Sequence, residues 1–291
     1  MGKKHITRRD FMQKSAALAL AAGLDMNLEA KEKTAVALVR DKNALDDKAR
    51  VNGLAMQDML DRALMALTGE KNPVDSMKRL IKPNDIVGIK SNAWSYMPTP
   101  AELEQAIERR VMDAGVKKEN ISIDDRGVRR NPVFQRATAI INVRPVRTHY
   151  WAGIGGCIKN MILFSDTPSK YHPDSCADLA QVWLHTGIRD KVKLNILSAL
   201  TPLFNGRGPH HYDRRYLWDY KGIIAGTDPV AVDTVGLELI KAKRREFFKE
   251  DINFYTNPKH VGLADTRHGL GTGDLKKINL IKLGWDENIL I

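Results

Sequence analysis

The sequence predicts an α/β protein with a mainly parallel sheet flanked by helices, built either as one domain or as two lobes around a cleft. Three observations support this prediction. Short apolar runs alternate with helical stretches from about residue 34 onward, as in sheets whose strands are connected by helices. Hydrophobic residues make up 43% and charged residues 28% of the chain, which is ordinary for a globular protein. The 291 residues are enough to bury a large core.

Apolar, β-rich runs predict the strands, and longer stretches with helical periodicity predict the helices. Strands are expected at residues 34–39, 85–90, 120–124, 138–143, 193–197, 222–225 and 278–282. Helices are expected at residues 49–67, 100–114, 177–184 and 229–249. The last helix has a strong start signal, because Asp228 can cap it and Pro229 suits its first turn. Residues 205–220 lack periodicity and are expected to form a long functional loop.

Residues 1–30 predict a twin-arginine signal peptide, and residues 31–291 the folded α/β domain. Arg8 and Arg9 precede an aromatic residue and a small-residue apolar run at 15–24. The alternative is an amphipathic first helix of the fold. The run at 15–24 has no polar residues at helical spacing, which disfavours this alternative. Export by the twin-arginine translocase implies a periplasmic or other extracytoplasmic location. Removal of the signal and its retention as an anchor both stay open.

The charge and the cysteine count restrict the classes of partner and cofactor. Lys and Arg number 46 against 35 Asp and Glu, which gives a net charge of +11 and favours anionic partners. The charge is scattered and the chain has no helix-turn-helix, zinc-finger or RNA-recognition signature, so nucleic acid is disfavoured. The 2 cysteines cannot supply the four thiolates of an iron–sulfur cluster. No apolar run reaches the roughly 18 residues of a membrane-spanning helix, so we expect no transmembrane span in the mature chain.

Polar side chains follow four of the predicted strands, where each strand ends. In open α/β sheets, ligands bind beyond the carboxyl ends of the strands, so these side chains predict a ligand-binding cleft. The residues are Lys90 and Asn92, then Asp125 and Arg126, then Arg144, Arg147 and His149, and finally Asp228. Loops are polar in any case, so the prediction rests on the four strand ends together. The arginines bind carboxylate and phosphate through two parallel hydrogen bonds, which favours an anionic ligand beside His149.

The segment from His149 to Asn160 is the most specific in the chain, with the sequence HYWAGIGGCIKN. A histidine at a strand end is followed by a glycine-rich turn and then by Lys159. His149 is therefore a candidate acid or base, Lys159 a candidate anion anchor or covalent attachment point, and Asn160 a ligand-binding residue. The alternative interpretation is a tight strand-to-helix turn with Lys159 in solvent.

The segments VRTHYWAGIGGCIKNM, GIIAGTDPVAVDTVG, GLGTGDLKKINLIKLG and KPNDIVGIKSN resemble the bacterial and archaeal family catalogued as domain of unknown function 362. The resemblance covers nearly all of residues 34–285. The family has no generally established activity. Many members carry a cysteine-rich, ferredoxin-like insertion that this chain lacks, so the resemblance implies no iron–sulfur role here.

About a dozen residues around His149 are also similar to a motif of nickel-pincer lactate racemases. This resemblance implies that His149 transfers a proton and that Lys159 holds a nucleotide-derived cofactor. The two motifs then diverge, because the racemase motif continues into a Pro-Gly loop, whereas this chain continues with Asn160 and Met161.

Several other side chains have both a functional and a structural interpretation. His172 could place a second imidazole near Lys159 and hold a divalent metal, or it could be an ordinary surface histidine. Asp233 lies in an otherwise apolar helical stretch and either faces the cleft and binds the ligand or needs a buried partner. At most one of the adjacent His210 and His211 is expected to act as a ligand.

The sequence leaves open whether the two cysteines pair, and it leaves three hypotheses for the function. Cys157 and Cys176 could pair as a disulfide after export or be two separate buried thiols. The leading hypothesis is an exported protein whose cleft binds an anionic ligand, a metal or a nucleotide-derived cofactor and transfers a proton at His149 and Lys159. A non-catalytic periplasmic binding or assembly protein is the first alternative. A redox partner that borrows its cofactor from another subunit is the second.

Overall fold

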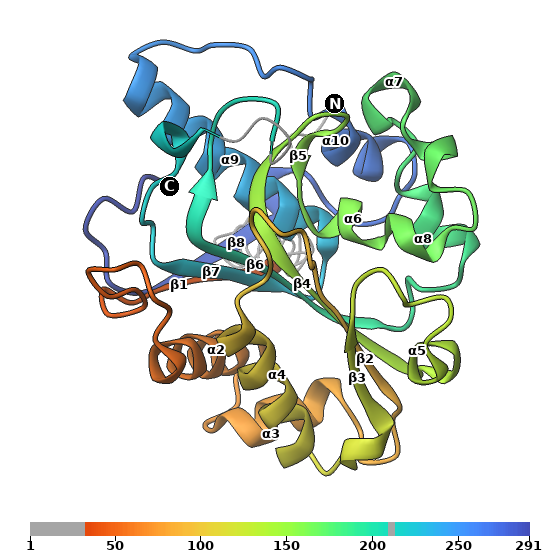
Figure 1. The fold of residues 1–291 in the computed structure, drawn as a ribbon. Coiled ribbons are helices and arrows are strands. Elements are labelled where there is room, and N and C mark those ends of the chain that lie inside the picture. Colours follow the sequence, from red (N-terminus) through yellow and green to blue (C-terminus); the bar gives the residue numbers. More distant parts are fainter. Residues whose placement is uncertain (1–32, 209–212) are drawn as a thin grey trace, which may run out of the picture. The chain divides into compact units, whose positions relative to one another are not determined.

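The apolar runs of the sequence form the strands of one mixed sheet, which crosses the middle of Figure 1. The computed structural model describes residues 33–208 and 213–291. The predicted signal peptide, with Arg8 and Arg9, and the pair His210 and His211 lie outside the described residues. Within the described ranges, no helix is long and apolar enough to cross a membrane.

The sheet has the strand order β3-β2-β4-β6-β7-β1-β8, and the short β5 pairs with β4. Six of the strands run parallel to one another, whereas β7 is antiparallel to both of its neighbours and β5 is antiparallel to β4. The sheet is therefore mainly parallel, as predicted. The strands are β1 (Thr34–Arg40), β2 (Val87–Lys90), β3 (Ile121–Asp124), β4 (Ala139–His149), β5 (Gly153–Gly155), β6 (Val192–Leu203), β7 (Gly222–Gly226) and β8 (Ile278–Gly284).

Helices cover both faces of the sheet (Figure 1). Successive side chains of a strand point to opposite faces of the sheet. On β1, Ala37 and Val39 therefore pack with one group of helices, and Val36 and Leu38 pack with the other. The first layer contains α2 (Gly53–Thr68), α3 (Pro73–Leu80) and α4 (Ala101–Asp113). The second contains α6 (Cys157–Asn160), α8 (Gln181–His185), α9 (Pro229–Phe248) and α10 (Lys259–Thr266).

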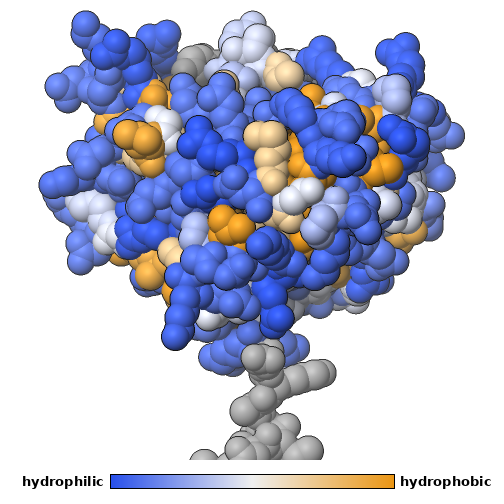
Figure 2. All heavy atoms as spheres, turned by 90° about the horizontal axis from the view of Figure 1, so that it is seen from below, coloured by the Kyte–Doolittle hydropathy of each residue, from blue (hydrophilic) through white to orange (hydrophobic). Residues whose placement is uncertain are grey.

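The short helices α5 (Pro132–Arg136) and α7 (Pro173–Cys176) complete the described helices. Seen from the side on which α3 and α4 lie, the surface is mostly hydrophilic and its apolar side chains form small separate spots (Figure 2). Residues 34–291 form one compact unit.

Several predicted elements differ from the structure, and the strand predicted at 193–197 extends over Val192–Leu203. The helix predicted at 49–67 begins at Gly53, because Ala49 has a positive φ of 57° and Asn52 caps the helix. The strand predicted at 138–143 continues to His149, because β5 and β6 both pair with its second half. The helix predicted at 177–184 is shorter, Gln181–His185. It follows a left-handed turn in which Asp174, Ser175 and Cys176 all have positive φ.

Candidate functional site

The carboxyl ends of β2, β3 and β4 meet at one edge of the sheet, because these strands run parallel. A cavity of about 360 Å³ lies at this edge. Nine of the residues that line the cavity are ones that the sequence analysis singled out: Asn92, Asp125, Arg126, Arg144, Arg147, His149, Lys159, Asn160 and His172. The remaining lining residues are Trp94, Trp151, Ile162, Leu163 and Pro168. The structure thus brings together most of the side chains that the strand ends and the glycine-rich motif indicate.

Lys90 supports this lining from a fully buried position. Its Nζ donates to Asp125 Oδ1 at 2.6 Å and to the Ser91 carbonyl at 2.7 Å. Burial lowers the pKa of Lys90 to about 8. Burial alone would raise the pKa of Asp125, but the Lys90 ammonium reverses this and holds it below its ordinary value. The pair is therefore charged at neutral pH and fixes Asp125 on the cavity wall.

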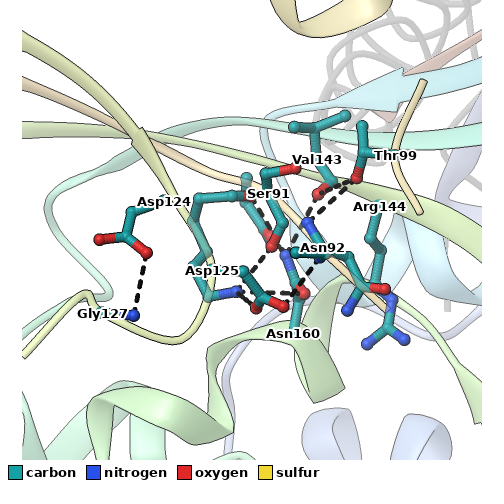
Figure 3. Close-up of polar contacts among 12 residues, drawn as sticks. Ser91, Asn92, Thr99, Asp124, Asp125, Gly127, Val143, Arg144 and Asn160 are labelled. Carbon is teal, nitrogen blue, oxygen red and sulfur yellow. Dashed lines mark hydrogen bonds and ion pairs between the residues drawn. The ribbon is translucent and has the colours of Figure 1, made fainter. Parts of the chain in front are cut away.

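Asn160 links α6 to the strands beneath the cavity. Its Nδ2 donates to Asn142 Oδ1 at 2.8 Å and to the carbonyls of Lys90 and Val143, each at 3.2 Å. Asn142 in turn donates to Asn195 Oδ1 at 2.9 Å. Figure 3 shows Asn160, Asp125 and Arg144 lying together although they come from different elements. This buried network fixes α6 relative to β2 and β4.

Arg144 and Arg147 are buried cations that form no ion pair within the described structure. Arg144 donates from Nη1 to the Gly156 carbonyl at 3.2 Å, and Arg147 donates to the Met97 carbonyl and to Asn92 Oδ1. Only 2% of Arg144 and 3% of Arg147 is exposed, and the Nε of each has no hydrogen-bond partner in the described structure. Burial lowers the pKa of both guanidinium groups, and Arg144 lowers that of Arg147 further, although Asp125 raises the pKa of both and Asp233 that of Arg144.

His149 is held at the end of β4 in a defined tautomer. The backbone N–H of Trp151 donates to His149 Nδ1 at 3.2 Å, so the neutral ring carries its proton on Nε2. Burial, and then the positive charges of Lys159, Arg144 and Arg147, lower the pKa of His149 well below its ordinary value. At neutral pH, His149 is therefore an uncharged imidazole with an Nε2–H that can donate.

Lys159 of α6 and His172, which directly precedes α7, form a second pair in the lining. The Lys159 Nζ lies 3.0 Å from His172 Nε2, and only 5% of Lys159 is exposed. Burial lowers the pKa of Lys159 to about 8. Burial and the neighbouring Lys159 lower the pKa of His172 to about 4. The His172 ring stacks on Trp151, with ring centroids 4.3 Å apart and planes at 19°.

Asp233 lies in the apolar interior of α9 and fixes the glycine-rich turn. Its Oδ1 accepts from the Cys157 N–H at 2.5 Å and its Oδ2 from the Ile158 N–H at 2.9 Å. A Cβ on Gly156 would collide with this carboxylate, so the turn requires glycine here. Burial raises the pKa of Asp233 to about 6. Asp233 does not line the cavity, and it supports the site from behind α6.

Asp228 lies at the opposite edge of the sheet from the cavity. β7 is antiparallel, so the strand end that precedes Asp228 pairs with the beginnings of β1 and β6. Asp228 caps α9 by accepting from the N–H groups of Val230 and Ala231, and it also accepts from the Thr272 N–H. The expectation that Asp228 joins the other strand ends is therefore wrong, because the rule holds only for parallel strands.

The described residues contain no group of three or more His, Cys, Asp or Glu side chains that could hold a metal ion. His172 faces Lys159 rather than a second ligand. Cys157 and Cys176 are free, separately buried thiols. Burial raises the pKa of both thiols, and nearby Asp233 raises that of Cys157 further.

A comparison with protein families finds a match to the part of the chain that contains most of this site. Residues 119–238 match the family model described as Domain of unknown function (DUF362). The matched part runs from just before β3 into α9 and contains His149, Lys159 and the arginines, whereas Lys90 and Asn92 precede it. No curated protein and no solved structure matches the chain. The DUF362 description states no activity, so the function is argued from the site.

Sequence reasoning missed several residues of the site. Trp94 and Trp151 form part of the wall, and Asn142 joins the buried network. His260 of α10 is 1% exposed, and burial and Lys159 lower its pKa to about 3. The isolated Asn142 in an apolar strand was the available signal, because a buried amide needs hydrogen-bond partners.

Proposed function

We propose that the chain is an exported protein that binds a small organic anion in this cavity and transfers a proton at His149 and Lys159. The observation that carries the proposal is the pair of buried guanidinium groups, Arg144 and Arg147, that form no direct ion pair with a described carboxylate. A buried charge is unfavourable unless it is paired. A carboxylate or phosphate in the cavity would supply the missing partner.

The balance of charge around the cavity favours the same class of ligand. Arg126, Arg144, Arg147 and Lys159 line it, and the Asp125 carboxylate is already paired with Lys90. This positive lining attracts anions and repels divalent metal ions. The volume of about 360 Å³ falls in the range of small-molecule sites, which is roughly 300–1,000 Å³.

His149 and Lys159 are suited to proton transfer because the neutral imidazole presents a donor and the lysine changes protonation state near neutral pH. His149 offers the Nε2–H as a donor, and the pKa of Lys159, at about 8, lets it act as ammonium or amine. The resemblance to the lactate racemase motif supports the role of His149, whereas it gives Lys159 the role of holding a nucleotide-derived cofactor. The phosphate of a nucleotide-derived cofactor would also suit Arg144 and Arg147.

The two alternative functions differ from this one in observable ways. A non-catalytic binding protein would use the same arginines without any chemistry at His149. A redox role is less well supported, because Cys157 and Cys176 are buried thiols whose raised pKa disfavours the reactive thiolate. The export part of the proposal rests on Arg8, Arg9 and the apolar run that follows them.

Calorimetric titration with lactate, pyruvate and inorganic phosphate tests the anion site. Replacing Arg144 or Arg147 with Ala should weaken binding by about 1.5–3 kcal/mol, roughly ten- to hundredfold in Kd, which is the scale of a charged hydrogen bond. Arg129→Ala is the matched control, since Arg129 is exposed and lies outside the cavity. Unchanged affinity in both folded cavity variants would show that the anion binds elsewhere.

A further inference from the structure

Lys159 differs from an ordinary buried lysine because no carboxylate neutralises it within the described structure. The titratable and charged groups around it are Arg144 on β4, His149, His172, Cys176 and His260. Arg144 is a cation and the three imidazoles are neutral at pH 7. Burial without a counter-ion favours the uncharged form of a lysine. Near neutral pH, a larger share of Lys159 than of an ordinary lysine is therefore the free amine, which is the nucleophilic form.

His172 is placed to take a proton from this amine. Its Nε2 lies 3.0 Å from the Lys159 Nζ, and its ring is held by stacking on Trp151. A neutral imidazole can accept a proton through Nε2 when its own proton is on Nδ1. The contact therefore provides a short route for the proton that a nitrogen loses when it forms a new bond.

The same cavity carries the groups that a carbonyl compound with a carboxylate needs. His149 presents an Nε2–H donor, and Arg144 and Arg147 supply guanidinium donors for a carboxylate. An amine, an acid and an anion anchor thus line one cavity of about 360 Å³. A 2-oxo acid has its carbonyl carbon next to its carboxylate, so both groups can be engaged together.

We propose that Lys159 forms an imine with 2-oxo acids, and that these are the anions the cavity takes. This inference rests on the proposed anion site and names its substrate class. The free amine of Lys159 adds to the carbonyl carbon, and the carbonyl electron pair moves to the oxygen, which accepts a hydrogen bond from His149 Nε2–H. One proton of the nitrogen passes through His172 to that oxygen and gives a neutral carbinolamine. The carbon–oxygen bond then breaks, the oxygen leaves as water with the second proton of the nitrogen, and the carbon–nitrogen double bond forms.

Borohydride trapping of the full chain with pyruvate tests this step. Borohydride delivers a hydride to the imine carbon and leaves a stable secondary amine. The expected product is one adduct per chain, with a mass increase equal to pyruvic acid minus one oxygen atom, and peptide mapping should place it on Lys159. Lys159→Arg should lose the adduct, whereas Lys170→Arg, which changes an exposed lysine near the cavity, should keep it.

The role of His172 is tested through the pH profile of trapping. Burial is the main cause of the low Lys159 pKa, so His172→Ala, which opens the site to water, should move the midpoint of the trapping rate to higher pH. An unchanged midpoint would show that His172 does not position the amine.

Calorimetry with lactate, which has the carboxylate but no carbonyl, separates the two proposals. Lactate and pyruvate binding without an adduct on Lys159 would overturn the imine and leave the anion site standing. Failure of both acids to bind would overturn the anion site itself. Because mapping of the unmodified sequence identifies the reacting lysine directly, the test does not depend on the folding of any variant.

Discussion

Lys90 and Lys159 are both buried at the same edge of the sheet, but only Lys90 has a charged partner that neutralises it. Lys90 has a carboxylate partner, Asp125, at 2.6 Å, while the nearest partner of Lys159 is the neutral His172. Burial lowers the pKa of each to about 8. The ion pair keeps Lys90 in a structural role, whereas Lys159 retains an unsatisfied charge when it is protonated.

This contrast predicts opposite effects of the same substitution. Lys90→Met should destabilise the fold by about 3–5 kcal/mol, because it leaves the buried Asp125 unpaired. Lys159→Met should stabilise the fold at pH 7, because it removes a buried ammonium without a counter-ion. Urea denaturation of the two variants measures both changes. Equal destabilisation would show that Lys159 has a neutralising partner.

The pH dependence of the Lys159→Met effect follows from the direction of the shift. Below pH 8 the lysine is protonated in both the folded and the unfolded chain, so the full cost of burial is present. Between about 8 and the ordinary value of 10.5, the folded protein has lost the proton and the unfolded chain still binds it. The unfolding free energy of the wild type therefore rises over this range, and the advantage of the variant should disappear.

At the scale of elements, the turn at 174–176 shows a conformation that its residues do not favour. Asp174, Ser175 and Cys176 have φ values of 52°, 56° and 61°. Left-handed backbone costs an L-residue about 1–2 kcal/mol, and glycine largely avoids this cost. The turn leads directly from His172 to the buried Cys176, so it positions the imidazole that contacts Lys159.

Ser175→Gly should therefore stabilise the protein by about 1 kcal/mol, measured as a higher melting temperature. Ser169→Gly is the control, because Ser169 lies in the 3₁₀ helix Pro168–Tyr171, where φ is negative and glycine should destabilise by about 0.5–1 kcal/mol. A lower melting temperature for Ser175→Gly would mean that other contacts of the serine outweigh its backbone conformation.

The elements also show what a single sequence can predict. The Asp228-Pro229 start signal indicates α9 correctly, and the same chemistry begins α3 and α5 at Asn72-Pro73 and Asn131-Pro132. Those helices are short, so they have too few turns to show a clear periodicity. The signal at their starts was nevertheless present.

The direction of a strand is harder to predict than its existence. The run that forms β7 is as apolar as its neighbours, and nothing in its five residues records that it runs antiparallel. The strand-end argument therefore succeeds for Lys90, Asp125 and Arg144, which follow or lie in parallel strands, and fails for Asp228. Arg144 and Arg147 were expected after a strand, but they lie within β4. The strand continues to His149 because its second half pairs with β5 and β6.

At the scale of the whole molecule, the proposed export predicts a simple outcome. Changing Arg8 and Arg9 together to Lys should leave the precursor in the cytoplasm, because the translocase reads the arginine pair. Cell fractionation and immunoblotting measure this, with Lys3 and Lys4 changed to Arg as the control. Normal export of the double-lysine variant would contradict the twin-arginine route.

The position of β1 has a consequence for how the protein is made. β1 pairs with β7 along one edge and with β8 along the other, and both of these strands come from the last third of the chain. A ribosome therefore releases this apolar strand long before either neighbour exists, and the sheet closes only after synthesis reaches β8. During that interval, β1 exposes two unpaired edges to other chains. Chaperone binding early in translation should consequently matter more for this fold than for one that assembles from its amino terminus.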